Sequence, residues 1–262
     1  MRIALAAFLV GCLPWSGGAT ADEQAPRGVV ELFTSQGCSS CPPADRLASE
    51  LAHDGRTLVL TLPVDYWDYL GWKDTLASPS NTARQRAYAL ARGDRKVYTP
   101  QIVVNGREAA VGGDGAAVMG AISRAETDGG LALPVNLKIR DGRVEVAVAA
   151  PRRPLAAPHA EVWAFAFERA HEVQIGRGEN AGRTATYANV VRHMTRLGAW
   201  DGAPAKFEVP AEEVLSAGAD GLAVLVQSGT GGQPGAILGA AQADPAVFDA
   251  TTTAARLARD PY

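Results

Sequence analysis

A pair of cysteines lies between a strand-like and a helix-like segment and limits the folds open to this chain. Cys38 and Cys41 are separated by two serines. The apolar run GVVELFT precedes them at 28–34, and ADRLASELA follows at 44–52, with leucines four residues apart on one helical face. A C-x-x-C at a strand-to-helix junction is typical of redox-active dithiols. We therefore expect a strand end and a helix start to meet at this loop.

Strand and helix signals alternate along the first half of the chain. The expected elements are strands at 28–34, 57–64 and in a hairpin at 101–113, and helices at 44–52, 80–93 and 114–127. Ser78-Pro79 is typical of an N-cap followed by a first-turn proline, and Asp114 is an expected N-cap. Asn105-Gly106 is the residue pair favoured in type I′ hairpin turns. The order βαβαββα predicts an α/β domain.

The second half has a different texture. Beyond residue 130, short β-rich runs follow one another without helical segments, separated by Gly and Pro clusters. Regularly spaced short strands predict a mostly antiparallel β-sandwich. The predicted plan is a signal peptide at 1–21, an α/β domain at 22–130 with an aromatic insertion at 64–78, a β-sandwich-like domain at 131–243 and a C-terminal tail at 244–262.

The N-terminus has the pattern of a secretory signal peptide. Arg2 supplies the positive charge, residues 3–10 form an apolar run, and small residues at 19–21 precede the expected cleavage at Asp22. This pattern predicts a periplasmic or secreted protein. Cys12 offers a lipoprotein alternative, which is weaker because the apolar run before it is short. No segment is long enough to predict a membrane span.

The charge balance argues against one class of partner. The formal net charge is -3, and no cluster of Lys or Arg provides the basic face that phosphate binding requires. Nucleic acid is therefore not an expected partner. The four histidines are scattered without the spacing of a zinc site, so no metal and no cofactor is predicted.

Signal cleavage would leave Cys38 and Cys41 as the two cysteines of an exported chain, where disulfides persist. The pair permits three interpretations: a redox couple, a metal clamp or a structural staple. A bridge that closes so short a loop removes little chain entropy, which weakens the staple. A thiolate is stabilised at a helix N-terminus. Cys38 is then the attacking thiolate, Cys41 resolves the mixed disulfide, and Ser39 and Ser40 can hydrogen-bond the sulfur.

On the motif VELFTSQGCSSC, residues 28–128 resemble the thioredoxin/glutaredoxin superfamily. More narrowly, the motifs ELFTSQGCSSCPPAD, VDYWDYLGWKD, ARQRAY, VYTPQ and GRGENAGR together resemble an exported bacterial family with no settled activity. The resemblance implies a thioredoxin-like domain followed by a C-terminal β domain. It also implies a cis-proline at Pro100 that faces the cysteines, with the backbone beside it, at Thr99, pairing with substrate. The alternative is a plain proline at the start of a strand.

Two further residues bear on the chemistry of the cysteines. Glu31 lies seven residues before Cys38. If buried, it can shuttle protons for Cys41, as a buried acid does in thioredoxins; the alternative is a strand-face carboxylate that reaches solvent or an Arg. Pro42-Pro43 depart from an ordinary thioredoxin and predict a helix that starts later than usual, which would weaken the dipole effect on Cys38.

Aromatic residues crowd the insertion at 64–78. They are Tyr66, Trp67, Tyr69 and Trp72, and they either floor a ligand groove beside the cysteines or pack the insertion onto the core. The predicted substrate-binding residues are Gln36, Ser39, Ser40, Trp67 and Thr99. The glycine-rich GRGENAG at 176–182 lies between expected strands and is interpreted as a sandwich loop, not a phosphate loop.

The sequence as a whole favours an exported thiol–disulfide oxidoreductase. Its predicted catalytic residues are Cys38, Cys41, Pro100 and Glu31, and its expected partners are protein or small-molecule thiols and disulfides. Two alternatives remain open. Two thiolates at a loop-to-helix junction can carry Cu(I), or the fold can be a ligand-binding module in which the disulfide only braces the loop.

Overall fold

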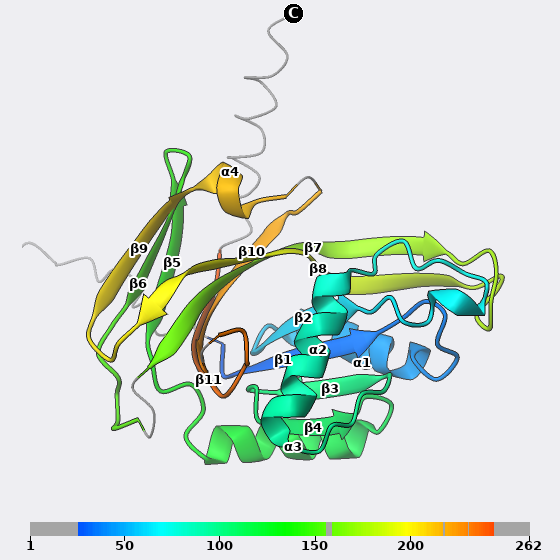
Figure 1. Ribbon diagram of the computed structural model, residues 1–262, viewed down its shortest axis with the longest axis horizontal. Coiled ribbons are helices and arrows are strands. Elements are labelled where there is room, and N and C mark those ends of the chain that lie inside the picture. The colour runs from blue at the N-terminus through cyan, green and yellow to red at the C-terminus, as the bar shows by residue number, and fades with distance from the viewer. Residues whose placement is uncertain (1–25, 156–158, 217, 230, 244–262) are drawn as a thin grey trace, which may run out of the picture.

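The computed structural model describes residues 26–155, 159–216, 218–229 and 231–243 (Figure 1). The predicted signal peptide at 1–21 and the predicted tail at 244–262 lie outside these residues. The strands are β1 (Gly28–Thr34), β2 (Thr57–Pro63), β3 (Gln101–Val104), β4 (Glu108–Val111), β5 (Val135–Arg140), β6 (Arg143–Val148), β7 (Ala160–Gln174), β8 (Thr184–Trp200), β9 (Ala205–Pro210), β10 (Gly221–Ser228) and β11 (Ile237–Gln242). The helices are α1 (Pro42–Asp54), the short 3-10 helix η1 (Asp68–Leu70), α2 (Pro79–Arg92), α3 (Gly115–Thr127) and α4 (Ala211–Val214).

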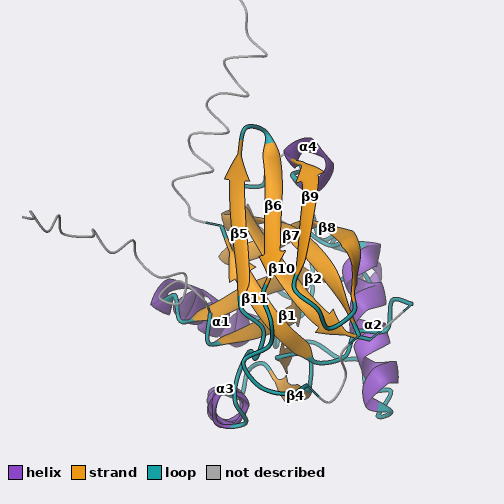
Figure 2. Ribbon diagram, turned by 90° about the vertical axis from the view of Figure 1, so that its left-hand side faces the viewer, coloured by secondary structure: helices purple, strands orange, loops and turns teal. Residues whose placement is uncertain are grey.

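The first half forms the predicted βαβαββα order. β1 pairs in parallel with β2 and antiparallel with β3, and β3 pairs with β4. The β3–β4 hairpin turns at Asn105 and Gly106, with φ of 46° and 68°, as expected for their turn type. Helices α1 and α2 lie on opposite sides of the sheet (Figure 2). This thioredoxin-like βαβ start confirms the predicted α/β region.

Helix α1 starts directly after the second cysteine. Cys41 is its N-cap residue, and the helix has proline in its first turn. The expectation that Pro42-Pro43 delay the helix is wrong, because first-turn prolines lack only N–H groups that have no intrahelical partner. The other two predicted N-caps are confirmed: Ser78 Oγ accepts from Ser80 N–H, and Asp114 accepts from Ala117 N–H.

The second half has the predicted antiparallel strands in two layers. β5, β6 and β9 form a separate three-stranded sheet, which faces the viewer in Figure 2. Its apolar side chains share one core cluster with residues of β7, β10 and β11, among them Val146, Val162 and Val224. The predicted fold class, an α/β region followed by a mostly antiparallel two-layer region, is therefore confirmed.

One sheet runs through both halves. Its strand order is β11-β10-β7-β8-β2-β1-β3-β4, so β8 lies beside β2. The two strands share a single parallel pairing, Thr61 with Val190. Side chains supplement it: Thr61 Oγ1 donates to the Ala188 carbonyl at 2.6 Å, and Asn189 Nδ2 donates to the Val59 carbonyl at 2.9 Å. The predicted boundary at residue 130 stays a prediction, although the sheet crosses it.

The long β7–β8 hairpin connects this architecture to the cysteine loop. Its paired strands extend past β2, and in Figure 1 their far end lies at the right, on the same side as α1. Residues 175–183 form the turn of the hairpin. Among the described helices, none has the length and apolar character needed to cross a membrane.

Candidate functional site

Cys38 and Cys41 form a disulfide at the junction of β1 and α1, with their Cα atoms 5.4 Å apart. The loop is tight, because the Cys38 N–H donates to the Ser35 carbonyl at 3.1 Å and the Cys41 N–H donates to the Cys38 carbonyl at 3.2 Å. Both cysteines are buried, with exposed fractions of 2% and 0%. The predicted pair is thus joined and largely shielded from solvent.

The two serines between the cysteines are exposed, and one of them reaches the proline loop. Ser40 Oγ lies 3.4 Å from Cys38 Sγ and donates to the Thr99 carbonyl at 3.5 Å. The Thr99–Pro100 peptide bond is cis, as predicted. These contacts bring Cys38, Ser40 and Thr99 together, although Ser40 and Thr99 are 59 residues apart in the sequence.

Pro100 and the first turn of α1 approach the same backbone position. A Cβ atom at Gly112 would lie 2.9 Å from the Ala44 Cβ and 3.1 Å from the Pro100 Cβ. Only glycine fits such a close approach. The Gly112 N–H also donates to the Pro100 carbonyl at 2.9 Å, which anchors the proline loop to the end of β4.

The aromatic insertion supports both loops through its indole groups. The Trp67 Nε1–H donates to Thr99 Oγ1 at 2.7 Å, and the Trp72 Nε1–H donates to Gln36 Oε1 at 2.7 Å. The Gln36 N–H donates to the Asp74 carboxylate at 2.7 Å. Burial raises the pKa of Asp74, although the hydrogen bonds from the backbone N–H groups of Gln36, Leu76 and Ala77 oppose the shift. The insertion therefore lies beside the cysteines, with Tyr69 pointing to solvent at 78% exposure.

Comparison with known proteins places this chain in a family. A family model described as a protein of unknown function, DUF1223, matches residues 29–227. The chain belongs to the DUF1223 family.

The DUF1223 protein is similar to two solved structures. Protein AGR_C_4864 from Agrobacterium tumefaciens has 38% identity and a TM-score of 0.73, over 83% of this chain and 94% of that chain. HBP35 of Porphyromonas gingivalis has 15% identity and a TM-score of 0.55, over 83% of this chain and 74% of that chain, a likeness of fold alone. The search of curated proteins found no match.

Glu31 is buried in the DUF1223 protein, but the structure does not bring it to the cysteines. Its neighbours Val29 and Phe33 pack with Tyr88 of α2, whereas Val30 and Leu32 pack with α1. Side chains alternate between the faces of a strand. The carboxylate of Glu31 therefore points to the α2 face, away from the helix that Cys41 begins.

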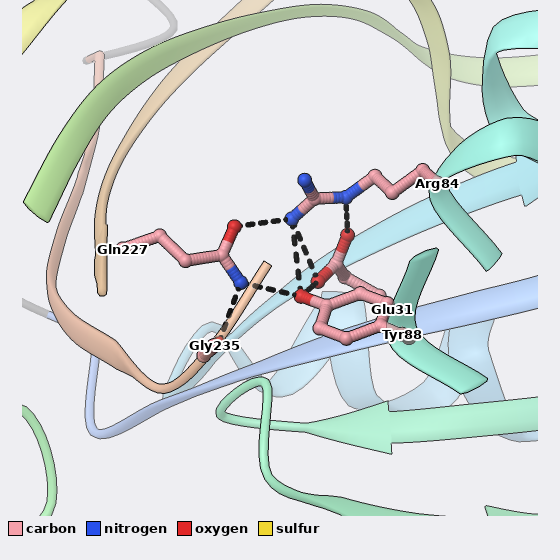
Figure 3. Close-up of polar contacts among 5 residues, drawn as sticks. All are labelled: Glu31, Arg84, Tyr88, Gln227 and Gly235. Carbon is pink, nitrogen blue, oxygen red and sulfur yellow. Dashed lines mark hydrogen bonds and ion pairs between the residues drawn. The ribbon is translucent and has the colours of Figure 1, made fainter. Parts of the chain in front are cut away.

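On that face Glu31 belongs to a closed polar network (Figure 3). Arg84 Nε donates to Glu31 Oε1 at 2.5 Å, and the Tyr88 hydroxyl donates to Glu31 Oε2. Gln227 Nε2 donates to the Tyr88 hydroxyl at 2.7 Å and to the Gly235 carbonyl at 2.8 Å. Burial alone would lower the pKa of Arg84, but the charge attraction and hydrogen bonds of Glu31 and Tyr88 together outweigh it and raise that pKa. The predicted proton-shuttle role of Glu31 stays untested, and this arrangement is that of a buried ion pair.

Asp45 is a buried acid on the cysteine face that the sequence reasoning missed. It lies in the first turn of α1, where its N–H donates to the Cys41 carbonyl at 3.1 Å. Burial raises the pKa of Asp45 to about 7, against the hydrogen bond from Thr34 Oγ1 at 2.7 Å. An acid four residues after a helix-capping cysteine lies one turn along the same helix, and that spacing was the available signal.

A pocket of about 610 Å³ opens beside this acid. It lies between α1 and the start of β8, and Pro42, Asp45, Asn180 and Tyr187 are among its lining residues. Burial, together with the charges of Asp45 and Asp74, raises the pKa of Tyr187, so this phenol keeps its proton. The pocket is therefore lined by Asp45 from α1 and by an uncharged tyrosine from β8.

The second missed feature is the turn of the β7–β8 hairpin, which was interpreted only as a sandwich loop. Asn180 Nδ2 donates to the carbonyls of Gln36 and Cys38 at 2.9 and 2.8 Å. The carboxylate of Glu179 accepts the Ser39 N–H at 3.2 Å. Because these contacts span about 140 residues of sequence, no local pattern could indicate them.

Proposed function

We propose that this DUF1223 protein is an exported thiol–disulfide oxidoreductase that acts through Cys38 and Cys41. The observation that carries the proposal is the disulfide at the β1–α1 junction, with the cis-proline loop held beside it through Ser40. Cys41 is the N-cap of α1, a position at which a helix N-terminus favours the thiolate form of a cysteine, so Cys41 is suited to leave as a thiolate. A cross-linked pair at such a position can exchange electrons with other thiols.

Reduction of the disulfide takes two thiol–disulfide exchange steps. A partner dithiol supplies a thiolate that attacks Cys38 Sγ, a mixed disulfide forms, and Cys41 leaves as a thiolate that takes up a proton. The second partner thiol then attacks the partner sulfur of the mixed disulfide and releases Cys38. Two electrons pass to the protein, the partner leaves as a disulfide, and the reverse sequence oxidises a partner.

The surroundings of the disulfide suggest roles for other residues. Ser39 and Ser40 are the exposed part of the loop, and Thr99 offers a backbone edge beside them, so a partner chain can lie across these three residues. Asp45, with its pKa of about 7, shares a helix and a sheet face with Cys41. We assign Asp45, in place of Glu31, as the group that exchanges the Cys41 proton.

Export rests on the sequence. The expected signal peptide at 1–21 would send the chain to an oxidising compartment. Disulfides such as the one between Cys38 and Cys41 form and persist in such compartments. The partners that fit are protein or small-molecule thiols and disulfides of the same compartment.

The test is the redox behaviour of the purified chain without residues 1–21. We expect a reduction potential within the roughly -120 to -270 mV span of thiol oxidoreductases and catalysis of insulin reduction that Cys38→Ser abolishes. Cys41→Ser should accumulate a mixed disulfide with glutathione at Cys38. A much lower potential together with no exchange would overturn the proposal, and stoichiometric Cu(I) binding without exchange would replace it with the metal-carrier alternative.

A further inference from the structure

The turn of the β7–β8 hairpin touches the cysteine loop at three backbone groups. Asn180 binds the carbonyls of Gln36 and Cys38, and Glu179 binds the N–H of Ser39. These groups lie on both sides of Cys38 and on its own carbonyl. A segment from the second half of the chain therefore holds the reactive cysteine in place.

Asn180 is built into the site. Its exposed fraction is 2%, and both of the hydrogen bonds that its side-chain amide donates go to the cysteine loop. It also lines the pocket beside Asp45. The two carbonyls belong to residues two positions apart in the chain. Because one amide group donates to both, it restricts the backbone conformation between Gln36 and Cys38.

Glu179 places a carboxylate on the amide that follows Cys38. The Ser39 N–H is the amide next to Cys38, and such amides stabilise a thiolate when they are free to point at it. Here the carboxylate of Glu179 takes that N–H and adds a negative charge nearby. Both effects oppose the thiolate, because like charges disfavour one another and a donor is used.

Other ionisable groups surround the loop. Those on the elements that contact it include Asp45, Arg46 and Glu50 of α1, Asp68, Lys73 and Asp74 of the insertion, Tyr98 before the proline, Arg177 and Arg183 of the hairpin turn, and Tyr187 of β8. Asp74 binds the Gln36 N–H and Asp45 binds Thr34, so each has partners of its own. Among the contacts of the described residues, Glu179 is the carboxylate that binds the amide following Cys38.

We propose that Glu179 and Asn180 are positioning residues that set the reactivity of Cys38, with Asn180 holding the cysteine loop closed and Glu179 disfavouring the Cys38 thiolate. This inference rests on the proposed thiol–disulfide exchange. A less stable thiolate makes the dithiol form less stable relative to the disulfide. The β7–β8 turn then makes the protein a weaker oxidant than its cysteine loop alone would be.

The equilibrium with glutathione measures this effect. Two glutathione thiols reduce the Cys38–Cys41 disulfide, giving the protein dithiol and one glutathione disulfide, with two electrons passed to the protein. Glu179→Gln keeps an oxygen acceptor for the Ser39 N–H and removes the charge. We expect the pKa of Cys38 to fall by about half a unit, as for one surface charge a few ångströms away. The equilibrium should shift toward the dithiol by up to about threefold.

The matched control is Glu172→Gln, which removes an equal charge from an exposed position on β7. It should leave both quantities unchanged. The difference between the two variants should shrink in about 1 M salt, where charges are screened within about 3 Å. An unchanged or raised Cys38 pKa in Glu179→Gln would overturn the role assigned to Glu179.

Asn180→Ala tests the positioning of the loop. We expect dithiothreitol to reduce its disulfide about fivefold faster, the factor that corresponds to the net contribution of one hydrogen bond of about 1 kcal/mol. Asn180→Leu offers a second variant in which the side-chain size is roughly kept, no charge is added and the donors are lost, so it should also react faster. Equal or slower reduction in both variants, with unchanged circular dichroism, would overturn the role assigned to Asn180.

The two proposals fail in distinguishable ways. If the protein without substitutions exchanges no electrons with thiols, the proposed oxidoreductase activity is wrong. If it exchanges them normally while the Glu179 and Asn180 variants match it, only the positioning role is wrong.

Discussion

Asp45 carries a carboxyl group whose pKa the fold moves into the neutral range. Desolvation is the main cause, and nearby Asp74 adds to it. An Asp with a raised pKa binds a proton more tightly in the folded than in the unfolded chain. Folding stability therefore falls as pH rises from the unfolded value near 3.8 to the folded value near 7.

Asp45→Asn should remove this pH dependence. Between pH 4 and pH 7, this group should cost the protein without substitutions on the order of 3 kcal/mol of unfolding free energy. The Asn variant has no such group, so its decrease in unfolding free energy over the same range should be smaller by about that amount. Urea denaturation at several pH values measures the difference. The interpretation is wrong if the two proteins show parallel stability curves across this range.

Glu31 illustrates how a shift of one position along a strand moves a side chain to the opposite face of the sheet. It was predicted to shuttle protons for Cys41 if buried, and the alternative was a strand-face carboxylate that reaches solvent or an Arg. The structure confirms its burial, but strand alternation turns it to the α2 face. The sequence contained the alternation, whereas the face that each helix covers depends on the packing of the whole sheet.

The aromatic insertion is an element with a supporting role beside the disulfide. Trp67 connects it to the cis-proline loop, and Trp72 connects it to the residue two positions before Cys38. Each indole N–H has a specific acceptor, so the rings are held in orientation as well as packed. The insertion thus fixes two segments that meet at the cysteines.

Trp67→Phe should weaken this support. A smaller aromatic ring remains while the hydrogen bond to Thr99 is lost, so we expect a decrease of at least about 1 kcal/mol in unfolding free energy. Chemical denaturation followed by circular dichroism provides the measurement. Tyr69→Phe, at an exposed ring in the same segment, is the control and should change stability by less than about 0.5 kcal/mol. Equal effects of the two substitutions would contradict the support role.

Local sequence patterns predicted most helices, strands, turns and caps, but they could not predict contacts between residues far apart in the sequence. The Asn105-Gly106 turn and the Ser78 and Asp114 caps depend on neighbouring residues, and each was predicted correctly. Asn180 acts on backbone groups more than 140 residues away, which no local pattern encodes. The cis-proline was predicted because a family resemblance supplied the distant relation that the residues alone lack.

The Glu31 network connects the two halves of the molecule. Glu31 lies on β1, Arg84 and Tyr88 lie on α2, and Gln227 lies on β10 of the second half. The apolar cluster around it likewise contains residues from both halves, such as Phe33 and Leu225. A common core and a common polar network favour unfolding as one unit.

Arg84→Met should therefore destabilise the whole molecule. It leaves Glu31 buried without its cation, a loss of about 3 to 5 kcal/mol in unfolding free energy. Adding Glu31→Gln should recover part of that loss. Both halves should unfold in one transition, monitored by tryptophan fluorescence and circular dichroism. Arg124→Met, which breaks an exposed ion pair with Glu108, should have no measurable effect.

The strand order also determines where this chain can be divided. Cutting after residue 130 would take away β8 and leave β2 as an uncovered edge. That strand, TLVLTLP, is uncharged, fully buried and rich in β-forming residues, which are the properties of a segment that recruits other chains. An isolated N-terminal fragment would therefore tend to aggregate through this edge. In the intact protein, β8 of the β7–β8 hairpin covers the edge of β2 and so prevents self-association through it.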